Sequence, residues 1–266
     1  MRQFLSKKGY ICDMDGVIYH GNRLLPGVKE FVDWLYKKDK HFLFLTNSGQ
    51  YTPHELHQKL SRMGLDVDDS HFYTSAQATA HFLQQQAPGC SAYVLGEHGL
   101  LNALYEVGIS YNDVDPDYVI VGEPSGYSID MITRAIRLVN KGARLVGTNY
   151  DLTGPTETGI APACRALMAP IELSTGKNAY YVGKPNPLMM RTGLKLLGVH
   201  SEDAAIIGDR MDTDIIAGIE SGLDTLLVLS GVTRREDCGQ FAYRPRLILD
   251  GVGDIPKADE ALEQNQ

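Results

Sequence analysis

The segment Gly9-Tyr10-Ile11-Cys12-Asp13-Met14-Asp15-Gly16-Val17 decides which fold and which site the sequence predicts. Its opening residues form an apolar run of the kind expected for a buried strand. Two carboxylates, Asp13 and Asp15, follow at once, and Gly16 allows the chain to turn. Because ligands bind at the carboxyl ends of strands in α/β sheets, Asp13 is a candidate nucleophile and Asp15 a candidate proton donor. Taken alone, the segment is equally compatible with a solvent-facing turn, in which Asp and Gly are common.

Short apolar runs alternate with longer amphipathic segments along the whole chain. This alternation is typical of a largely parallel sheet with helices packed on it, so we predict an α/β fold. Besides the first strand at Gly9–Cys12, the predicted strands are His41–Leu45, Ala92–Leu95, Tyr118–Val121, Arg144–Val146, Ala179–Val182, Ala204–Ile207, Thr225–Leu229 and Leu247–Leu249. Helices are expected between most of these strands.

Two helices carry clear end signals. The stretch from Pro26 to Lys38 predicts a helix with proline in its first turn, where the missing N–H is not needed. Thr52-Pro53-His54-Glu55 combines a capping threonine, a proline at the first helical position and a glutamate three residues after the cap. Gly64 is expected to end this second helix.

The composition bounds the class of protein. The 266 residues suit one large domain or two of ordinary size, and 25 Lys and Arg against 33 Asp and Glu give a net charge of −8. Since the basic residues are scattered, neither a nucleic acid polymer nor a membrane surface is an expected partner. No signal-peptide-like segment and no run of ~18 apolar residues is present, so a cytoplasmic location is expected. Homo-oligomerisation is left open.

Two further clusters follow predicted strands and suit a phosphate group. Thr46-Asn47-Ser48-Gly49 supplies a hydroxyl, an amide and backbone N–H groups, which can hold phosphate oxygens without adding charge. Gly183-Lys184-Pro185-Asn186-Pro187 supplies a lysine that can neutralise a phosphate, next to a proline that restricts the chain. Taken singly, the first cluster is also an ordinary loop, and the second is also a surface lysine before a helix.

A fourth cluster is acidic. Gly208-Asp209-Arg210-Met211-Asp212-Thr213-Asp214 follows the predicted strand at Ala204–Ile207 and opens a helix. Its carboxylates suit a hard cation such as magnesium, which takes oxygen ligands. Acidic residues are also favoured in the first turn of a helix, so one of these aspartates is expected to serve the helix only.

The joint occurrence of the four clusters favours one site. Four strand ends each supply a different part of a phosphoryl-transfer site: a carboxylate pair, phosphate ligands, a lysine and metal-binding carboxylates. The phosphate loop G-x-x-x-x-G-K-[ST] of nucleotide-hydrolysing proteins is absent from the sequence.

The order DMDGV, TNS, GKPNP and GDRMDTD resembles the four motifs of haloacid dehalogenase (HAD) superfamily phosphatases, most of all their NagD-like branch. The likeness runs along the whole chain and includes YTSAQATAHFL, PDYVIVGE, GTNYD and LVLSGV. It implies a Rossmann-like HAD core with a mostly parallel sheet and an inserted, smaller α/β cap domain. We expect the core at residues 1–77 and 179–266 and the cap at residues 78–178.

The resemblance also implies roles for the motif residues. Asp13 would be the nucleophile, and Asp15 the general acid that protonates the leaving alcohol and then, as a base, activates water. Thr46, Asn47 and Lys184 would bind the substrate's phosphoryl group.

A magnesium ion is the cofactor that the resemblance implies. Asp13 and Asp209 would hold it with their side chains and Asp15 with its backbone carbonyl, while Asp214 would support it directly or through water.

Residues of the expected cap are candidates for substrate contact. Asn149, Tyr150 and Asp151, followed by Leu152–Glu157, form a candidate substrate-facing loop, although a simple turn after a strand explains them equally well. Arg165 is either a contact for a substrate anion or an exposed helix arginine.

The predicted function is therefore magnesium-dependent hydrolysis of small phosphomonoesters. Nucleoside 5′-monophosphates such as UMP are the first candidate substrates, and sugar phosphates, pyridoxal phosphate and phosphoglycolate are the alternatives. A haloacid dehalogenase would need neither a magnesium site nor Asp15, and an ion pump would need membrane spans. A catalytically silent small-molecule sensor would be favoured by loss of Asp13, Asp15 or Lys184, and all three are present.

Overall fold

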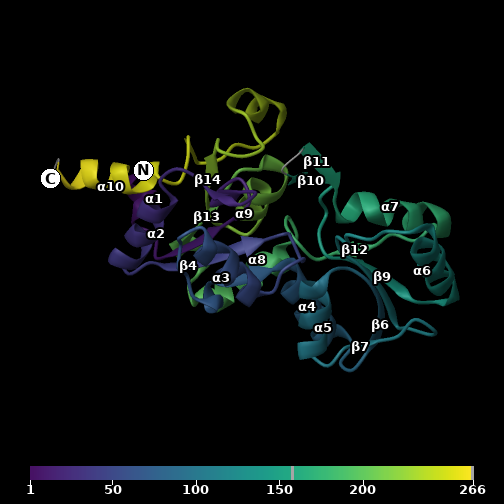
Figure 1. The fold of residues 1–266 in the computed structure, drawn as a ribbon. Coiled ribbons are helices and arrows are strands. Elements are labelled where there is room, and N and C mark those ends of the chain that lie inside the picture. Colours follow the sequence, from purple (N-terminus) through teal and green to yellow (C-terminus); the bar gives the residue numbers. More distant parts are fainter. Residues whose placement is uncertain (157–158, 265–266) are drawn as a thin grey trace. The chain divides into compact units, whose positions relative to one another are not determined.

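The computed structural model describes residues 1–156 and 159–264 (Figure 1). It divides into two compact units. The first, here called the core unit, comprises Met1–Thr46, His57–Tyr73 and Met190–Gln266. The second, here called the cap unit, comprises Asn47–Leu56 and Thr74–Met189. Each unit is built around its own sheet.

The core unit contains a six-stranded sheet of order β15-β14-β13-β1-β4-β5. Its strands are β1 (Gly9–Cys12), β4 (His41–Thr46), β5 (Phe72–Thr74), β13 (Ala204–Gly208), β14 (Asp224–Val228) and β15 (Leu247–Leu249). The central strands run parallel, with Cys12 opposite Ile207 in β13 and opposite Phe44 in β4. All four residues of β1 are buried, which accounts for its continuous apolar sequence. The segments that leave β1 and β13 therefore start side by side.

Helices and short segments complete this part of the chain. They are α1 (Arg2–Leu5), α2 (Val28–Lys37), α3 (Pro53–Arg62), α8 (Pro187–Leu197), a π-helical turn (Met211–Ile215) that leads into α9 (Ile216–Glu220), and α10 (Asp254–Glu263). A small hairpin joins β2 (Tyr19–His20) to β3 (Arg23–Leu24), and 3-10 turns lie at Asp69–His71, Ser201–Asp203 and Arg235–Gln240.

The cap unit contains a five-stranded sheet of order β12-β9-β8-β6-β7, in which neighbouring strands are parallel. The strands are β6 (Ser91–Leu95), β7 (Ser110–Tyr111), β8 (Tyr118–Val121), β9 (Arg144–Gly147) and β12 (Tyr180–Tyr181). The helices are α4 (Ser75–Gln86), α5 (His98–Glu106), α6 (Ile129–Lys141) and α7 (Cys164–Thr175). A hairpin of β10 (Thr153–Thr156) and β11 (Gly159–Pro162) leads into α7.

Helices lie on both faces of the cap sheet, with α4 and α5 on one side and α6 and α7 on the other (Figure 1). Ala135 and Leu138 of α6 and Met168 of α7 share a buried cluster with residues of β6, β8 and β9. This layered arrangement is what short apolar strands separated by amphipathic helices predict.

The predicted fold class is confirmed, and a predicted helix boundary that differs from the structure has a physical cause. Three predicted strands match the structure at both ends: β1, β8 and β15. The helix predicted from Pro26 begins at Val28 instead, because Gly27 before it adopts a left-handed conformation with φ of 77°. Within the described part of the chain, no helix has both the length and the apolar composition needed to cross a bilayer.

Candidate active site

Three of the predicted carboxylates gather at the ends of β1 and β13. Asp13 follows β1 directly, and its N–H donates to the carbonyl of Ile207 in β13 at 2.9 Å. One oxygen from each of Asp13, Asp209 and Asp214 lies within 4.8 Å of the others. Asp209 and Asp214 are buried, and Asp13 is half-buried. The chain thus places a compact set of carboxylate oxygens at one point of the sheet edge.

The segment after Asp13 turns sharply at Gly16, which has a φ of 78°. A Cβ on Gly16 would lie 2.6 Å from Oδ2 of Asp209, so only glycine allows this approach. Because of the turn, Asp13 and Asp15 do not continue as alternate residues of a strand. The Oδ1 atom of Asp15 lies 3.7 Å from Nδ1 of His20.

Burial changes the acidity of Asp15. It raises the pKa of this carboxyl above its ordinary value, and the nearby charges of His20 and Lys59 offset part of the rise. A raised pKa favours the protonated form, which is the form that a general acid needs.

The loop after β14 fixes Asp209. The backbone N–H of Val232 donates to Oδ2 of Asp209 at 2.6 Å, and the N–H of Thr233 donates to its carbonyl at 3.1 Å. A Cβ on Gly231 would lie only 2.0 Å from the same Oδ2 atom. The Oγ hydroxyl of Ser230 donates to the carbonyl of Gly16 at 2.7 Å. This loop begins in the segment LVLSGV, and we predicted no role for these residues from the sequence.

The acidic cluster at Asp209–Asp214 separates into different environments. Asp214 accepts a hydrogen bond from the N–H of Arg210 at 3.1 Å and is buried. Asp212 instead faces solvent and pairs with the guanidinium of Arg210 at 3.0 Å. Of the three aspartates, Asp212 is therefore the one outside the carboxylate cluster.

In the cap unit, Asn47 holds the backbone of Lys184 from both sides. The N–H of Lys184 donates to Oδ1 of Asn47 at 2.7 Å, and Nδ2 of Asn47 donates to the carbonyl of Lys184 at 3.0 Å. The same Nδ2 atom donates to Oδ2 of Asp151 at 2.8 Å. A Cβ on Gly183 would lie 2.7 Å from Oδ1 of Asn47, so this glycine permits the close approach.

Glu123 extends this arrangement, although sequence reasoning did not single it out. Its Oε1 atom accepts from Nδ2 of Asn149 at 2.9 Å, and Asn149 also donates to the carbonyl of Asn47 at 2.9 Å. Burial raises the pKa of Glu123 to about 7; the hydrogen bond from Asn149 lowers it and the charge of Asp151 raises it. In the sequence, Glu123 ends the segment PDYVIVGE, and no pattern in that segment marks this glutamate as different from a surface glutamate.

Tyr150 of the candidate substrate-facing loop contacts an arginine of α7. The guanidinium carbon of Arg165 lies 4.0 Å from the centre of the Tyr150 ring. The N–H of Arg165 donates to the carbonyl of Asp151 at 3.0 Å, so the start of α7 is tied to this loop. Glu157, the last residue of the predicted loop, lies outside the described residues.

The predicted site residues thus fall into two sets. Asp13, Asp15, Thr46, Asp209 and Asp214 belong to the core unit, and Asn47 and Lys184 belong to the cap unit. Thr46 is buried at the end of β4, and Lys184 is also buried.

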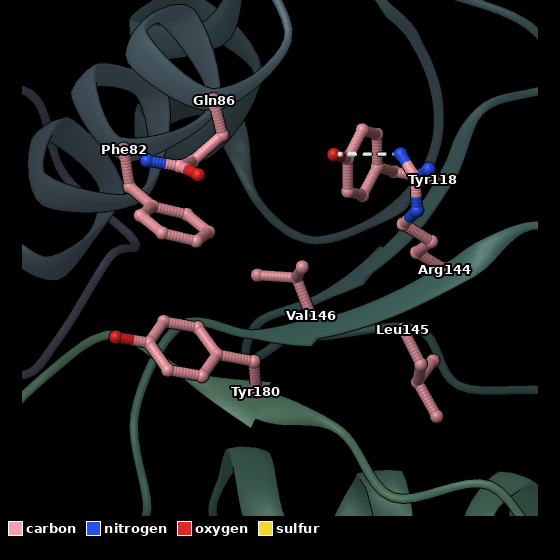
Figure 2. A pocket seen from close by; sticks show the side chains of 7 residues that line it. All are labelled: Phe82, Gln86, Tyr118, Arg144, Leu145, Val146 and Tyr180. Carbon is pink, nitrogen blue, oxygen red and sulfur yellow. Dashed lines mark hydrogen bonds between the residues drawn. The ribbon is translucent and has the colours of Figure 1, made fainter.

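The cap unit also has a hollow of about 400 Å³, which these residues do not line. Figure 2 shows Phe82 and Tyr180 on one side of it, Tyr118 and Arg144 on the other, and Val146 between them. The rings of Phe82 and Tyr180 stack with centres 4.9 Å apart, and Arg144 donates to the Tyr118 hydroxyl at 3.2 Å. No predicted site residue lines this hollow.

Comparisons with known proteins place the chain in a family. Residues 10–110 match the model of the haloacid dehalogenase-like hydrolases, and residues 181–255 match that of the HAD-hydrolase-like proteins. The chain is 44% identical over 251 residues to ribonucleotide monophosphatase NagD of Escherichia coli K12, which covers 94% of this chain and 99% of NagD. It is 43% identical over 246 residues to dihydroxyacetone phosphatase of Corynebacterium glutamicum, which covers 92% of this chain and 90% of that protein.

Solved structures agree with these sequence matches. The NagD structure from E. coli K-12 superposes with a TM-score of 0.88 at 43% identity, covering 94% of this chain and 98% of that one. The 4-nitrophenylphosphatase of Thermotoga maritima superposes with a TM-score of 0.92 at 32% identity, covering 96% and 98%. The chain belongs to the haloacid dehalogenase-like hydrolase family and is a NagD-like phosphatase of that family.

Proposed function

We propose that this phosphatase hydrolyses small phosphomonoesters through an aspartyl phosphate formed on Asp13. The observation that carries the proposal is the cluster of Asp13, Asp209 and Asp214, with ligand oxygens within 4.8 Å, in a chain of this family. Asp13 is the residue of this cluster that follows β1 and is partly exposed, which a nucleophile requires.

The cluster fits a divalent cation. Three carboxylates this close repel one another when ionised, and a hard cation with oxygen ligands removes that repulsion. We propose that Mg²⁺ is the ion, held by Asp13, Asp209 and the carbonyl of Asp15, with Asp214 in support. When bound, it would offset the negative charge that opposes attack of a carboxylate on a phosphate.

The proposed reaction has two steps. In the first, an oxygen of Asp13 attacks phosphorus, the ester P–O bond breaks, and Asp15 gives its proton to the leaving oxygen. In the second, Asp15 takes a proton from water, whose oxygen attacks phosphorus and breaks the bond to Asp13. Inorganic phosphate leaves, and both carboxyl groups return to their starting forms. The raised pKa of Asp15 supports its part in the first step.

Three further residues are proposed to act on the phosphoryl group. Lys184 would neutralise its charge and Thr46 would donate a hydrogen bond to one of its oxygens. Asn47 already uses its side chain to bind the backbone of Lys184, so we assign it to shaping the loop.

For the substrate, we propose nucleoside 5′-monophosphates such as UMP as the first candidates. The similarity to NagD supports this choice, because that relative is named for ribonucleotide monophosphates. Dihydroxyacetone phosphatase, at nearly the same identity, supports a small phosphorylated carbonyl compound or sugar instead. Pyridoxal phosphate and phosphoglycolate complete the set to be compared.

Purified protein assayed against this panel, with magnesium and with EDTA, tests the proposal. We expect turnover with magnesium only, and none in Asp13→Asn. Asp212→Asn is the control, because this aspartate lies in the acidic segment with Asp209 and Asp214 but pairs with Arg210 at the surface. Full activity in Asp13→Asn, or turnover in EDTA, would contradict the proposed mechanism.

A further inference from the structure

Glu123 lies where two adjacent strands of the cap sheet end. It follows β8 by two residues, and Asn149 follows β9 by two residues. These strands are paired in parallel, with Val121 opposite Gly147, so the two side chains start at the same sheet edge. Asn149 is fully buried, and its Nδ2 atom donates to Oε1 of Glu123 at 2.9 Å.

The Asn149 amide is held in one orientation. Its Nδ2 group donates to Glu123 and to the carbonyl of Asn47, and its Oδ1 atom accepts from the N–H of Asp151 at 3.1 Å. A carboxylate only accepts hydrogen bonds when ionised, so Glu123 fixes which end of the amide is the donor. The carbonyl of Asn47 also accepts from the Ser75 hydroxyl at 2.5 Å.

Asn47 in turn fixes the position of the Lys184 backbone. Its side chain both donates to and accepts from the backbone of Lys184, at 3.0 and 2.7 Å. The position of Lys184 therefore depends on Asn47, which depends on Asn149, whose amide is oriented by Glu123. All four residues belong to the cap unit.

We infer that Glu123 is a positioning residue for the phosphoryl-binding lysine, acting through the amides of Asn149 and Asn47. The inference rests on the proposed function, in which Lys184 binds the phosphoryl group. It gives a half-buried carboxyl group, which the proposed reaction does not use, a definite part in substrate binding.

The charge of Glu123 should modulate this arrangement. Its ionised form accepts a stronger hydrogen bond from Asn149 than its protonated form does. The charge of Asp151 raises the pKa of Glu123, and a hydrogen bond with the backbone of Cys164 lowers it. With a pKa of about 7, the ionised fraction falls as the pH drops through neutrality, and phosphate binding should weaken with it.

The test compares Glu123→Gln and Glu123→Ala with the wild type. Glutamine keeps an acceptor oxygen of the same reach, whereas alanine leaves Asn149 without it. We expect alanine to raise the inhibition constant for inorganic phosphate and the KM at least about tenfold. Glutamine should stay within about threefold. Inorganic phosphate changes its own charge between pH 6 and 8, so the pH dependence is measured with sulfate, whose charge is constant in this range. Sulfate affinity should change with pH in the wild type and not in Glu123→Gln. Glu97→Gln is the matched control, because Glu97 lies in the same unit and binds the N–H of Ser125 instead.

Two results would overturn the inference: phosphate affinity in Glu123→Ala equal to that of the wild type, or a pH dependence unchanged in Glu123→Gln. If the alanine variant does not fold, the inference is tested by the pH dependence of anion affinity in Glu123→Gln and by the backbone amide resonance of Lys184. That resonance should shift in Glu123→Gln and not in Glu97→Gln. Failure of the proposed function would show separately, as a wild-type protein without phosphatase activity.

Discussion

At the scale of single residues, neighbours in sequence have different surroundings and should have different effects. Asp209 is buried and accepts from Val232, whereas Asp212 is exposed and pairs with Arg210. Asp209→Asn should lower kcat/KM by roughly 100-fold or more, since metal-supported charge stabilisation is worth several kcal/mol. Asp212→Asn should stay within about twofold, because an exposed ion pair contributes little. Magnesium titrations of both variants check this, and equal losses would contradict it.

The proposed role of Asp15 as a general acid predicts that the effect of its loss depends on the leaving group. Proton transfer typically contributes about 100- to 10,000-fold, so Asp15→Asn should lose that much kcat/KM on alkyl phosphates. Nitrophenolate leaves readily without a proton, and kcat/KM for 4-nitrophenyl phosphate should fall much less. Steady-state kinetics with both substrates measure the difference. Equal losses on the two would show that Asp15 acts in another way.

Arg165 is the residue to test for substrate selection. Its guanidinium stacks on Tyr150, and its backbone is tied to Asp151. If it contacts a second anionic group of the substrate, Arg165→Gln should raise KM for such substrates about 10- to 100-fold, the usual effect of a lost charge-assisted hydrogen bond. KM for 4-nitrophenyl phosphate should not change. Arg137→Gln, which changes an exposed arginine on α6, is the control. If Arg165→Gln leaves KM unchanged for every substrate, Arg165 does not contact the substrate.

The motif residues could be predicted from the sequence, and the residues that support them could not. Asp13 and Asp209 follow apolar runs, and such strand ends are recognisable without a structure. Glu123 follows a strand as well, but one glutamate has no spacing or partner that marks it in sequence. Its role emerges only when Asn149 and Asn47, distant in the chain, lie within hydrogen-bond distance.

At the scale of elements, the apolar pattern identified every strand of the two larger sheets except β5 and β7. β5 and β7 have only three and two residues. The capping signal at Thr52 and Glu55 was reliable because both of its hydrogen bonds are local. Pro26 was misleading, since the left-handed Gly27 delays the helix.

The start of α4 allows a test of stability. Thr74 is buried, its hydroxyl accepts from the N–H of Gln77 at 3.2 Å, and its own N–H donates to the Gln77 side chain at 3.1 Å. Thr74→Ala should lower the free energy of unfolding by about 1–2 kcal/mol, as for other lost caps. Thr74→Ser keeps the hydroxyl and should lose less. Urea denaturation of the three proteins checks the order; a serine variant as unstable as alanine would assign the loss to packing.

At the scale of the whole molecule, attraction of a phosphate depends on local groups. The net charge is −8, so the surface as a whole repels an anionic substrate. In the proposed function, the buried Lys184 and the proposed cation would supply the attraction. The same cation would then also affect the stability of the carboxylate cluster that holds it.

That connection gives a prediction for the folded state. Without a cation, the oxygens of Asp13, Asp209 and Asp214 repel one another at up to 4.8 Å when ionised, and folding is opposed by that repulsion. The proposed magnesium ion would bind the folded state only, so at 100 times its dissociation constant it should add about 2.7 kcal/mol to the free energy of unfolding. Asp214→Asn removes one charge and keeps an acceptor for the N–H of Arg210. In EDTA, this variant should melt at a higher temperature than the wild type.

With saturating magnesium the order should reverse, because the wild type gains the full binding energy and the variant gains less. Thermal melts of both proteins in EDTA and in magnesium give the four values needed, with Asp212→Asn expected to follow the wild type in each. A wild-type melting temperature that magnesium does not move, in protein whose turnover requires the ion, would mean that the cation binds elsewhere. It would then act with the substrate and not through these three carboxylates.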